Sequence, residues 1–215
     1  MLFNLNKPLR LAFLAEKPAL IVYASGVPIW RRTPVLTEYT VDQTIFFPDW
    51  ARFIDFVGVG GGTSGQTGNG GNGVAGRGGN PGQWIGVTIE RGVDIPWTAK
   101  QAVLTIGKGG AQAPDNDFAA ANPGSASGIS ITGYAGIIAP GGSGTRPEVQ
   151  QAGKAAPNFT YNSNVYTGGQ GGNQDHPTGY RPGGAGAGGD GGIFGNRTRG
   201  HAGGDGTIWT YMRSF

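Results

Sequence analysis

The chain has 215 residues, of which 44 are glycine, 37% are hydrophobic, 13% are charged and none is cysteine, and its formal net charge is +3. The longest basic run is the pair Arg31-Arg32, so we expect no nucleic-acid partner. No apolar span reaches 18 residues, so we expect no insertion into a membrane. Without cysteine, disulfides and thiolate metal sites are excluded.

The N-terminal region contains short runs of β-prone residues. ALIVY (19–23) and VPIW (27–30) flank a short connection that contains glycine, which predicts a β-hairpin. The alternating run EYTVDQTIFF (38–47) predicts one further strand. We therefore expect residues 1–47 to form a small β region for attachment or oligomerisation, followed by a glycine-rich domain over residues 48–215.

From residue 53 onward, strand patterns alternate with glycine tracts. The expected strands lie in FIDFVGV (53–59), QWIGVTIERG (83–92), KQAVLTIGKGG (100–110), ISITGYAGIIAPGGSG (129–144) and TIWTYMRSF (207–215). Residues 145–182 are polar and predict a long loop or insertion. No segment has an apolar period of 3.6 residues, so the predicted fold class is mainly β with almost no α-helix.

Within the tracts, glycine recurs at every third position. One run holds Gly70, Gly73, Gly76, Gly79 and Gly82, and another holds Gly183, Gly186, Gly189, Gly192 and Gly195. A period of three is that of a polyproline-II-type helix, and glycine along one edge lets a second helix approach until their backbones form hydrogen bonds. We expect these ten glycines to be structural, in a bundle of short polyglycine-II helices. A flexible glycine linker is the alternative, whereas collagen is excluded because the register slips and proline is sparse.

The motifs that would indicate catalysis or a cofactor are incomplete. Gly58 and Gly60 begin a dinucleotide fingerprint, but Thr63 replaces its third glycine and no helix follows. His176 and His201 are isolated in polar surroundings, with no partner pattern for a base or a metal ligand. Asp190 and Asp205 do not follow a nine-residue calcium repeat and are expected to be turn or surface carboxylates. We therefore expect no enzyme activity, no metal and no cofactor.

Aromatic residues in the polar segment form the candidate binding site. Tyrosine among Asn, Gly and Ser is typical of adaptable recognition loops, and loops on a rigid scaffold often carry binding. The candidate receptor-binding residues are Phe159, Tyr161, Asn162, Tyr166 and Tyr180. The alternative is that these aromatics hold their own loop in place. Recognition is expected in loops at about 111–128 and 145–182.

Several motifs, taken in chain order, resemble one known family. They are LIVYASGVPIW (20–30), PDWARFIDFVGVGGG (48–62), AVLTIGKGG (102–110), ISITGYAG (129–136) and GGDGTIWTYMRSF (203–215). Together they resemble the glycine-rich domain of minor tail and tail fibre (receptor-binding) proteins of actinobacterial, including mycobacterial, phages. The resemblance implies a component of the virion tail tip, with a polyglycine-II sandwich and distal loops that bind a receptor.

These observations lead us to expect a non-enzymatic phage tail protein that attaches to the host-cell surface. Its expected partners are other tail proteins, sister chains in a homotrimer, and a glycan or glycolipid of the host envelope. Its expected location is the tail tip of the virion. A structural tail assembly protein without a receptor is the alternative. An ice-binding or extracellular matrix protein is a third possibility, but the tracts lack a regular face of Thr or Ala.

Overall fold

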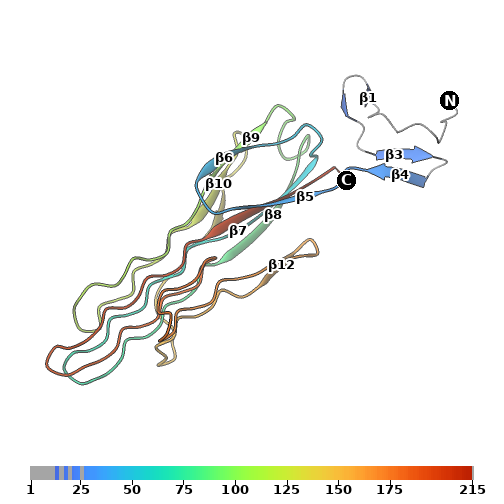
Figure 1. Ribbon diagram of the computed structural model, residues 1–215. Coiled ribbons are helices and arrows are strands. Elements are labelled where there is room, and N and C mark those ends of the chain that lie inside the picture. The colour runs from blue at the N-terminus through green and yellow to red at the C-terminus, as the bar shows by residue number, and fades with distance from the viewer. Residues whose placement is uncertain (1–12, 15–16, 19–20, 25–26, 215) are drawn as a thin grey trace.

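The computed structural model describes residues 13–14, 17–18, 21–24 and 27–214. Within these residues every regular element is a β-strand, as predicted. Among the same residues no helix is long and apolar enough to cross a membrane. The strands occupy one half of an elongated molecule, and glycine-rich segments extend from their ends as a bundle (Figure 1).

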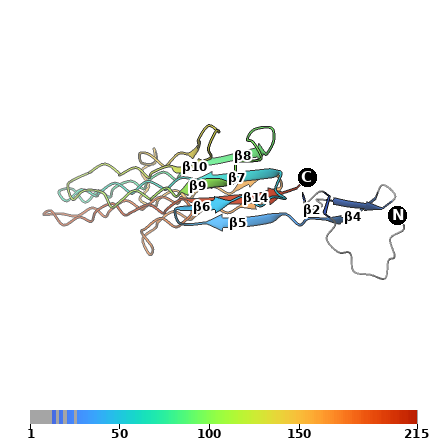
Figure 2. The ribbon, with the colours of Figure 1, turned by 90° about the horizontal axis from the view of Figure 1, so that it is seen from above.

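Two antiparallel sheets pack face to face around a shared core, and their strands overlap when the molecule is seen from above (Figure 2). The first sheet has the order β5 (Val35–Tyr39), β14 (Thr207–Arg213), β7 (Phe53–Val59) and β8 (Trp84–Glu90). The second sheet has the order β11 (Ile137–Ala139), β10 (Ser127–Ser130), β9 (Gln101–Thr105) and β6 (Gln43–Phe46). The core between them is apolar and includes Ile54, Phe56, Ile89, Leu104, Ile129 and Ile208. This core fixes the ends from which the bundle starts.

A hairpin covers the outer face of the first sheet. It consists of β12 (Phe159–Tyr161) and β13 (Asn164–Tyr166) and packs on Val57, Val59 and Trp209. β7 and β14 are thereby buried on both faces, and the sequence of β7 is accordingly apolar at nearly every position, whereas β14 also buries Thr207 and Thr210. The prediction of a long loop at 145–182 is corrected here, since this segment contains the hairpin.

The N-terminal strands confirm one prediction and correct another. β3 (Ile21–Ala24) and β4 (Val27–Arg31) pair antiparallel as the predicted hairpin, after the short pair β1 (Phe13–Leu14) and β2 (Lys17–Pro18). The prediction of a single strand over 38–47 is wrong, because β5 pairs with β14 in the first sheet and β6 pairs with β9 in the second. Asp42 holds the crossing between them by accepting a hydrogen bond from the Ile106 N–H at 2.7 Å. The expected boundary after residue 47 therefore falls inside the sandwich.

Residues 60–69 form the central segment of the bundle. Their N–H groups donate in turn to three different neighbours, each neighbour being reached at every third residue, with N···O distances of 2.8–3.2 Å. The acceptors lie in the segments 119–125, 198–204 and 74–83. Three further segments donate to carbonyls of the central segment, through Gly142, Gly110 and the series Gly186, Gly189 and Gly192. The central segment is therefore surrounded on all sides by backbone hydrogen bonds.

The glycines at spacing three lie where these segments approach most closely. A Cβ at Gly76, Gly79 or Gly82 would overlap a carbonyl oxygen of residues 60–66. A Cβ at Gly186, Gly189 or Gly192 would overlap a carbonyl oxygen of residues 196–201, and one at Gly70 would press on the Gly195 backbone. Gly73, Gly183 and Gly195 instead adopt positive φ angles of 73°, 71° and 81° in turns. Both uses require glycine, one for space and the other for backbone conformation.

Replacing Gly79 with alanine is expected to destabilise the fold by about 2–3 kcal/mol, because the added methyl group would overlap the Ser64 carbonyl oxygen. Gly128→Ala in β10 is the matched control, because a Cβ at this position would meet no atom within 4 Å. Thermal unfolding followed by circular dichroism measures both variants. We expect the midpoint to fall by roughly 5–10 °C for the first and to change little for the second. Equal midpoints would contradict the close approach of the segments.

Candidate functional site

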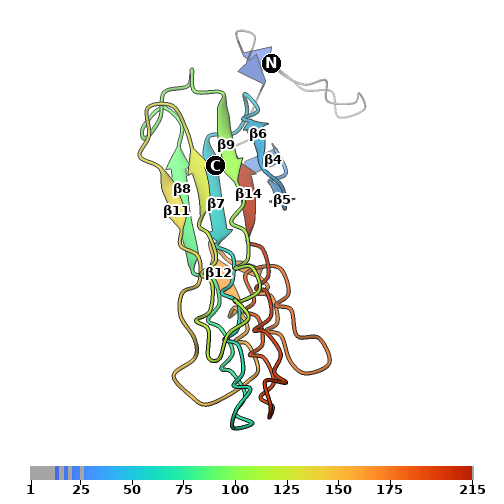
Figure 3. The same cartoon turned by 90° about the vertical axis from the view of Figure 1, so that its left-hand side faces the viewer.

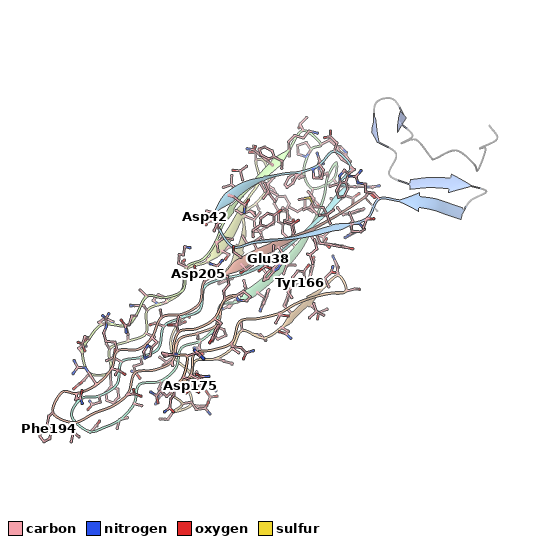
Figure 4. The ribbon with its side chains drawn as sticks, viewed as in Figure 1. Glu38, Asp42, Tyr166, Asp175, Phe194 and Asp205 are labelled. Atoms are coloured by element: carbon pink, nitrogen blue, oxygen red, sulfur yellow. The ribbon has the colours of Figure 1, made fainter. Side chains whose placement is uncertain are left out.

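Three turns form the end of the bundle farthest from the sandwich, and we name them the distal tip. They comprise residues 69–74, 114–118 and 193–197. Figure 3 shows the turns of the bundle projecting away from the sheets, and Figure 4 places Phe194 at the outermost point. The described strands and the C-terminal end of the chain lie toward the opposite end (Figure 1).

Short polar contacts join the three turns into one unit. The Gly195 N–H donates to the Gly70 carbonyl at 2.8 Å, and the Gly70 N–H donates to an Asp117 carboxylate oxygen at 2.8 Å. The Arg197 guanidinium forms ion pairs with Asp115 at 3.2 Å and with Asp117 at 3.1 Å. These contacts hold the three turns in fixed positions. The backbone of the turns therefore determines which side chains point outward.

Apolar side chains are exposed on the distal tip. Phe194 is 99% exposed, Ile193 60%, Val74 42% and Phe118 39%. Phe194 and Phe118 also have positive φ angles, 54° and 52°, a conformation that is uncommon for bulky residues and costs free energy. The exposed apolar rings and the strained backbone beneath them mark the distal tip as a candidate contact surface.

Sequence reasoning found only part of this site. The expected recognition loop at 111–128 includes Phe118, whereas Ile193 and Phe194 lie inside the predicted run of structural glycines that ends at Gly195. The sequence signal for this turn is the pair Ile193-Phe194, which interrupts a tract of otherwise small or polar residues. An apolar pair at a turn of a polar segment has no internal core to enter.

Three of the predicted receptor-binding aromatics pack together on the first sheet. The Phe159 ring stacks on Trp84 with centroids 5.4 Å apart, and Tyr161 stacks on Phe159 at 6.3 Å. Tyr166 is 3% exposed against Trp209, and burial raises the pKa of its hydroxyl to about 12. These contacts match the alternative that the aromatics hold their own segment in place, and their receptor role stays a prediction.

The two other predicted residues, Asn162 and Tyr180, do not take part in that aromatic stack. Asn162 donates from its side chain to the buried Asp55 carboxylate and to the Thr88 hydroxyl, both at 3.0 Å, which ties the hairpin turn to the sheet. Tyr180 is 45% exposed and contacts the His176 ring edge-on at 6.2 Å. Of the five predicted residues, Tyr180 thus has the most exposed aromatic ring.

A polar groove of about 310 Å³ lies along the bundle. Its lining includes Gln151, Asn173, Gln174, Asp190, Thr198 and His201. Burial lowers the pKa of His201 below its ordinary 6.5, against the opposing charge of Asp190, so the imidazole is neutral at pH 7. Amide, carboxylate and imidazole groups of this kind can form hydrogen bonds with hydroxyl groups. Among the described residues, no group of three or more His, Cys, Asp and Glu could hold a metal ion.

Asp205 joins the bundle to the sandwich, a role that its glycine-rich surroundings did not predict. Its carboxylate accepts the Gly109 N–H at 2.9 Å and pairs with Arg181 at 2.8 Å and Lys108 at 3.3 Å. Arg181 also donates to the Thr40 carbonyl at the crossing between the sheets. Burial alone would raise the pKa of Asp205, but these hydrogen bonds and charges outweigh it and lower the pKa below its ordinary 3.8.

The stability of the fold is expected to depend on Asp205 in a definite pH window. Because its pKa is lowered on folding, its contribution is fully present above the unfolded value and is lost as pH falls below about 4. Asp205→Asn should cost about 1 kcal/mol at pH 7, and the difference from the wild type should shrink toward pH 2. Denaturant unfolding at several pH values measures this, with the exposed Asp175→Asn as control. A deficit that stays constant from pH 7 to pH 2 would contradict the assignment.

Comparisons with known proteins place the chain among phage proteins. The family model described as "Glycine-rich domain" matches residues 37–159. The Gene 32 protein of Mycobacterium phage L5 is 37% identical over 143 residues, which cover 64% of this chain and 64% of that protein. The Gene 32 protein of Mycobacterium phage D29 is 34% identical over 179 residues, which cover 79% of this chain and 80% of that protein. The chain thus matches slightly less than two thirds of the L5 protein. The relationship to phage proteins that the sequence motifs implied is confirmed.

Proposed function

Because this chain belongs to the glycine-rich domain family and is related to proteins of two mycobacteriophages, we propose that it is a virion tail component, a minor tail protein or tail fibre tip, that contacts the host-cell surface. The observation that carries the proposal is the distal tip. It combines interlocked turns with exposed apolar side chains at the far end of an elongated body. Binding loops on a rigid scaffold are the usual arrangement for recognition.

The proposal includes a specific conformation for the bundle, in which the glycine-rich segments are polyglycine-II helices. Support comes from residues 60–69, whose N–H groups point in three directions in turn, as three residues per turn requires. Further support comes from Gly76, Gly79 and Gly82, where a side chain would overlap a neighbouring backbone. Such a bundle would be stiff, because each turn of the central segment is hydrogen-bonded to three neighbouring segments.

The opposite end of the molecule would attach the protein to other tail proteins and to sister chains, which we propose form a homotrimer. The outer face of the second sheet supports subunit packing. Phe46, Val103 and Ile138 are 71%, 46% and 58% exposed on it, and its other outward residues are uncharged. Faces depleted of charge are typical of the centres of interfaces. The same face also suits the alternative of a structural tail protein without a receptor.

For the host partner, we propose a glycan or glycolipid of the envelope. The groove with Asp190 and His201 offers hydrogen-bonding groups suited to sugar hydroxyls, and Tyr180 offers an exposed ring for stacking. The distal tip adds an apolar contact.

Purified chain is expected to bind Mycobacterium cells saturably and to block adsorption of a phage that carries this protein. The double variant Ile193→Ser/Phe194→Ser should lose at least tenfold in blocking potency at unchanged thermal stability, because both side chains are exposed. Val93→Ser, which is 72% exposed in the turn after β8, is the matched control and should block like the wild type. A folded wild-type chain that binds no cells would move the assignment to a structural tail protein.

A further inference from the structure

The turn that carries Phe194 is fixed by hydrogen bonds on both sides. The Asn196 N–H donates to the Ile193 carbonyl at 3.1 Å, and the Gly195 N–H anchors the turn to the Gly70 carbonyl at 2.8 Å. Phe194 nevertheless has almost no contact with the rest of the chain, since it is 99% exposed. The conformation of the turn therefore directs the Phe194 ring into solvent.

The shape of the tip restricts what can bury this ring. Phe194 lies at the outermost point of the bundle (Figure 4), so only a partner into which the tip is pushed can surround it. A folded protein would need a socket of matching shape, whereas a hydrocarbon layer deforms around an apolar side chain. Ile193 is exposed beside it, and Val74 and Phe118 are partly exposed on the neighbouring turns. The apolar contact can therefore widen as the tip enters.

The charges near the tip balance one another. Residues 66–77, 114–119 and 190–199 contain three arginines and three aspartates, so their formal charges cancel: Arg77, Arg197 and Arg199 against Asp115, Asp117 and Asp190. Asp115 and Asp117 are in addition paired directly with Arg197. The three turns alone carry Asp115 and Asp117 against Arg197, but with the adjoining residues the end of the bundle is neutral, so it has no net attraction to anionic headgroups and no net repulsion from them. Binding would then rest on the apolar side chains alone.

From these observations we propose that Ile193 and Phe194 insert into the acyl-chain region of a lipid surface. The inference rests on the proposed function and names the chemistry that the distal tip recognises. It revises the sequence-based expectation of no membrane insertion for these two side chains, while the rest of the chain stays outside the lipid.

Flotation with neutral phosphatidylcholine vesicles tests the proposal directly. Wild-type chain should float with the vesicles at millimolar lipid, equally at low and high salt. Phe194→Ser should lower the partition coefficient at least tenfold, because a buried phenylalanine ring contributes that much to transfer from water. Val93→Ser, an exposed apolar residue in the turn after β8, should float like the wild type. Flotation only with anionic vesicles, and only at low salt, would overturn the proposal.

A fluorescent probe reports on the tip itself. The chain contains no cysteine, so Asn196→Cys, at an exposed position beside Phe194, provides a single thiol for an environment-sensitive nitrobenzoxadiazole label. Vesicles should raise and blue-shift its emission, and adding Phe194→Ser should remove the response. The same label at Val93→Cys should not respond. No response at position 196 with phosphatidylcholine vesicles would overturn the inference.

The two proposals fail in different ways. If Phe194→Ser weakens the blocking of phage adsorption while the wild type neither floats nor changes its probe emission, the tip binds a protein or glycan, and the lipid inference is overturned while host attachment stands. If the wild type inserts into vesicles but neither binds cells nor blocks adsorption, the host-attachment proposal fails and lipid insertion stands.

Discussion

Backbone hydrogen bonds between segments hold the glycine-rich bundle together. Residues 60–69 satisfy their N–H groups entirely outside their own segment, on neighbours as distant in sequence as residue 204. Each bond contributes about 1 kcal/mol net, and each ordered glycine costs about 0.5–1 kcal/mol relative to alanine in a regular element. The balance is favourable only when many segments are present together, so the bundle depends on the sandwich to hold the segment ends side by side. The apolar core around Phe56 and Leu104 does this.

The parts of the fold that could be predicted are those in which packing restricts the residue type at individual positions. Glycine at every third position shows such a restriction, and so does the almost continuous apolar run of β7. The separation of β5 from β6 could not be predicted, because Thr40-Val41-Asp42 contains neither glycine nor proline and reads as extended chain. The β12–β13 hairpin was hidden for a related reason. Its turn lacks glycine, and its packing partners Trp84 and Trp209 lie far away in sequence.

The candidate site was harder to predict than the fold. Aromatic residues near Asn and Thr suggested a binding loop, yet Phe159 and Tyr166 are used for packing because two tryptophans on the sheet face them. Phe194 lies inside the predicted run of structural glycines, and only the arrangement of the three turns shows that it is the outermost side chain. Composition identifies the residues that can bind, but exposure in the folded chain decides which of them are available.

The antiparallel course of the bundle has a consequence for its length. Segments leave the sandwich and return to it, as residues 60–69 and 74–82 do, so adding three residues to each arm of a turn preserves every hydrogen-bond register below the insertion. In the proposed polyglycine-II conformation, each such step would extend an arm by about 9 Å, since the rise of that helix is about 3.1 Å per residue. Insertions of other sizes would rotate the glycine edge away from its neighbour. The body can therefore lengthen in triplets while its base stays unchanged, so reach and attachment can evolve independently.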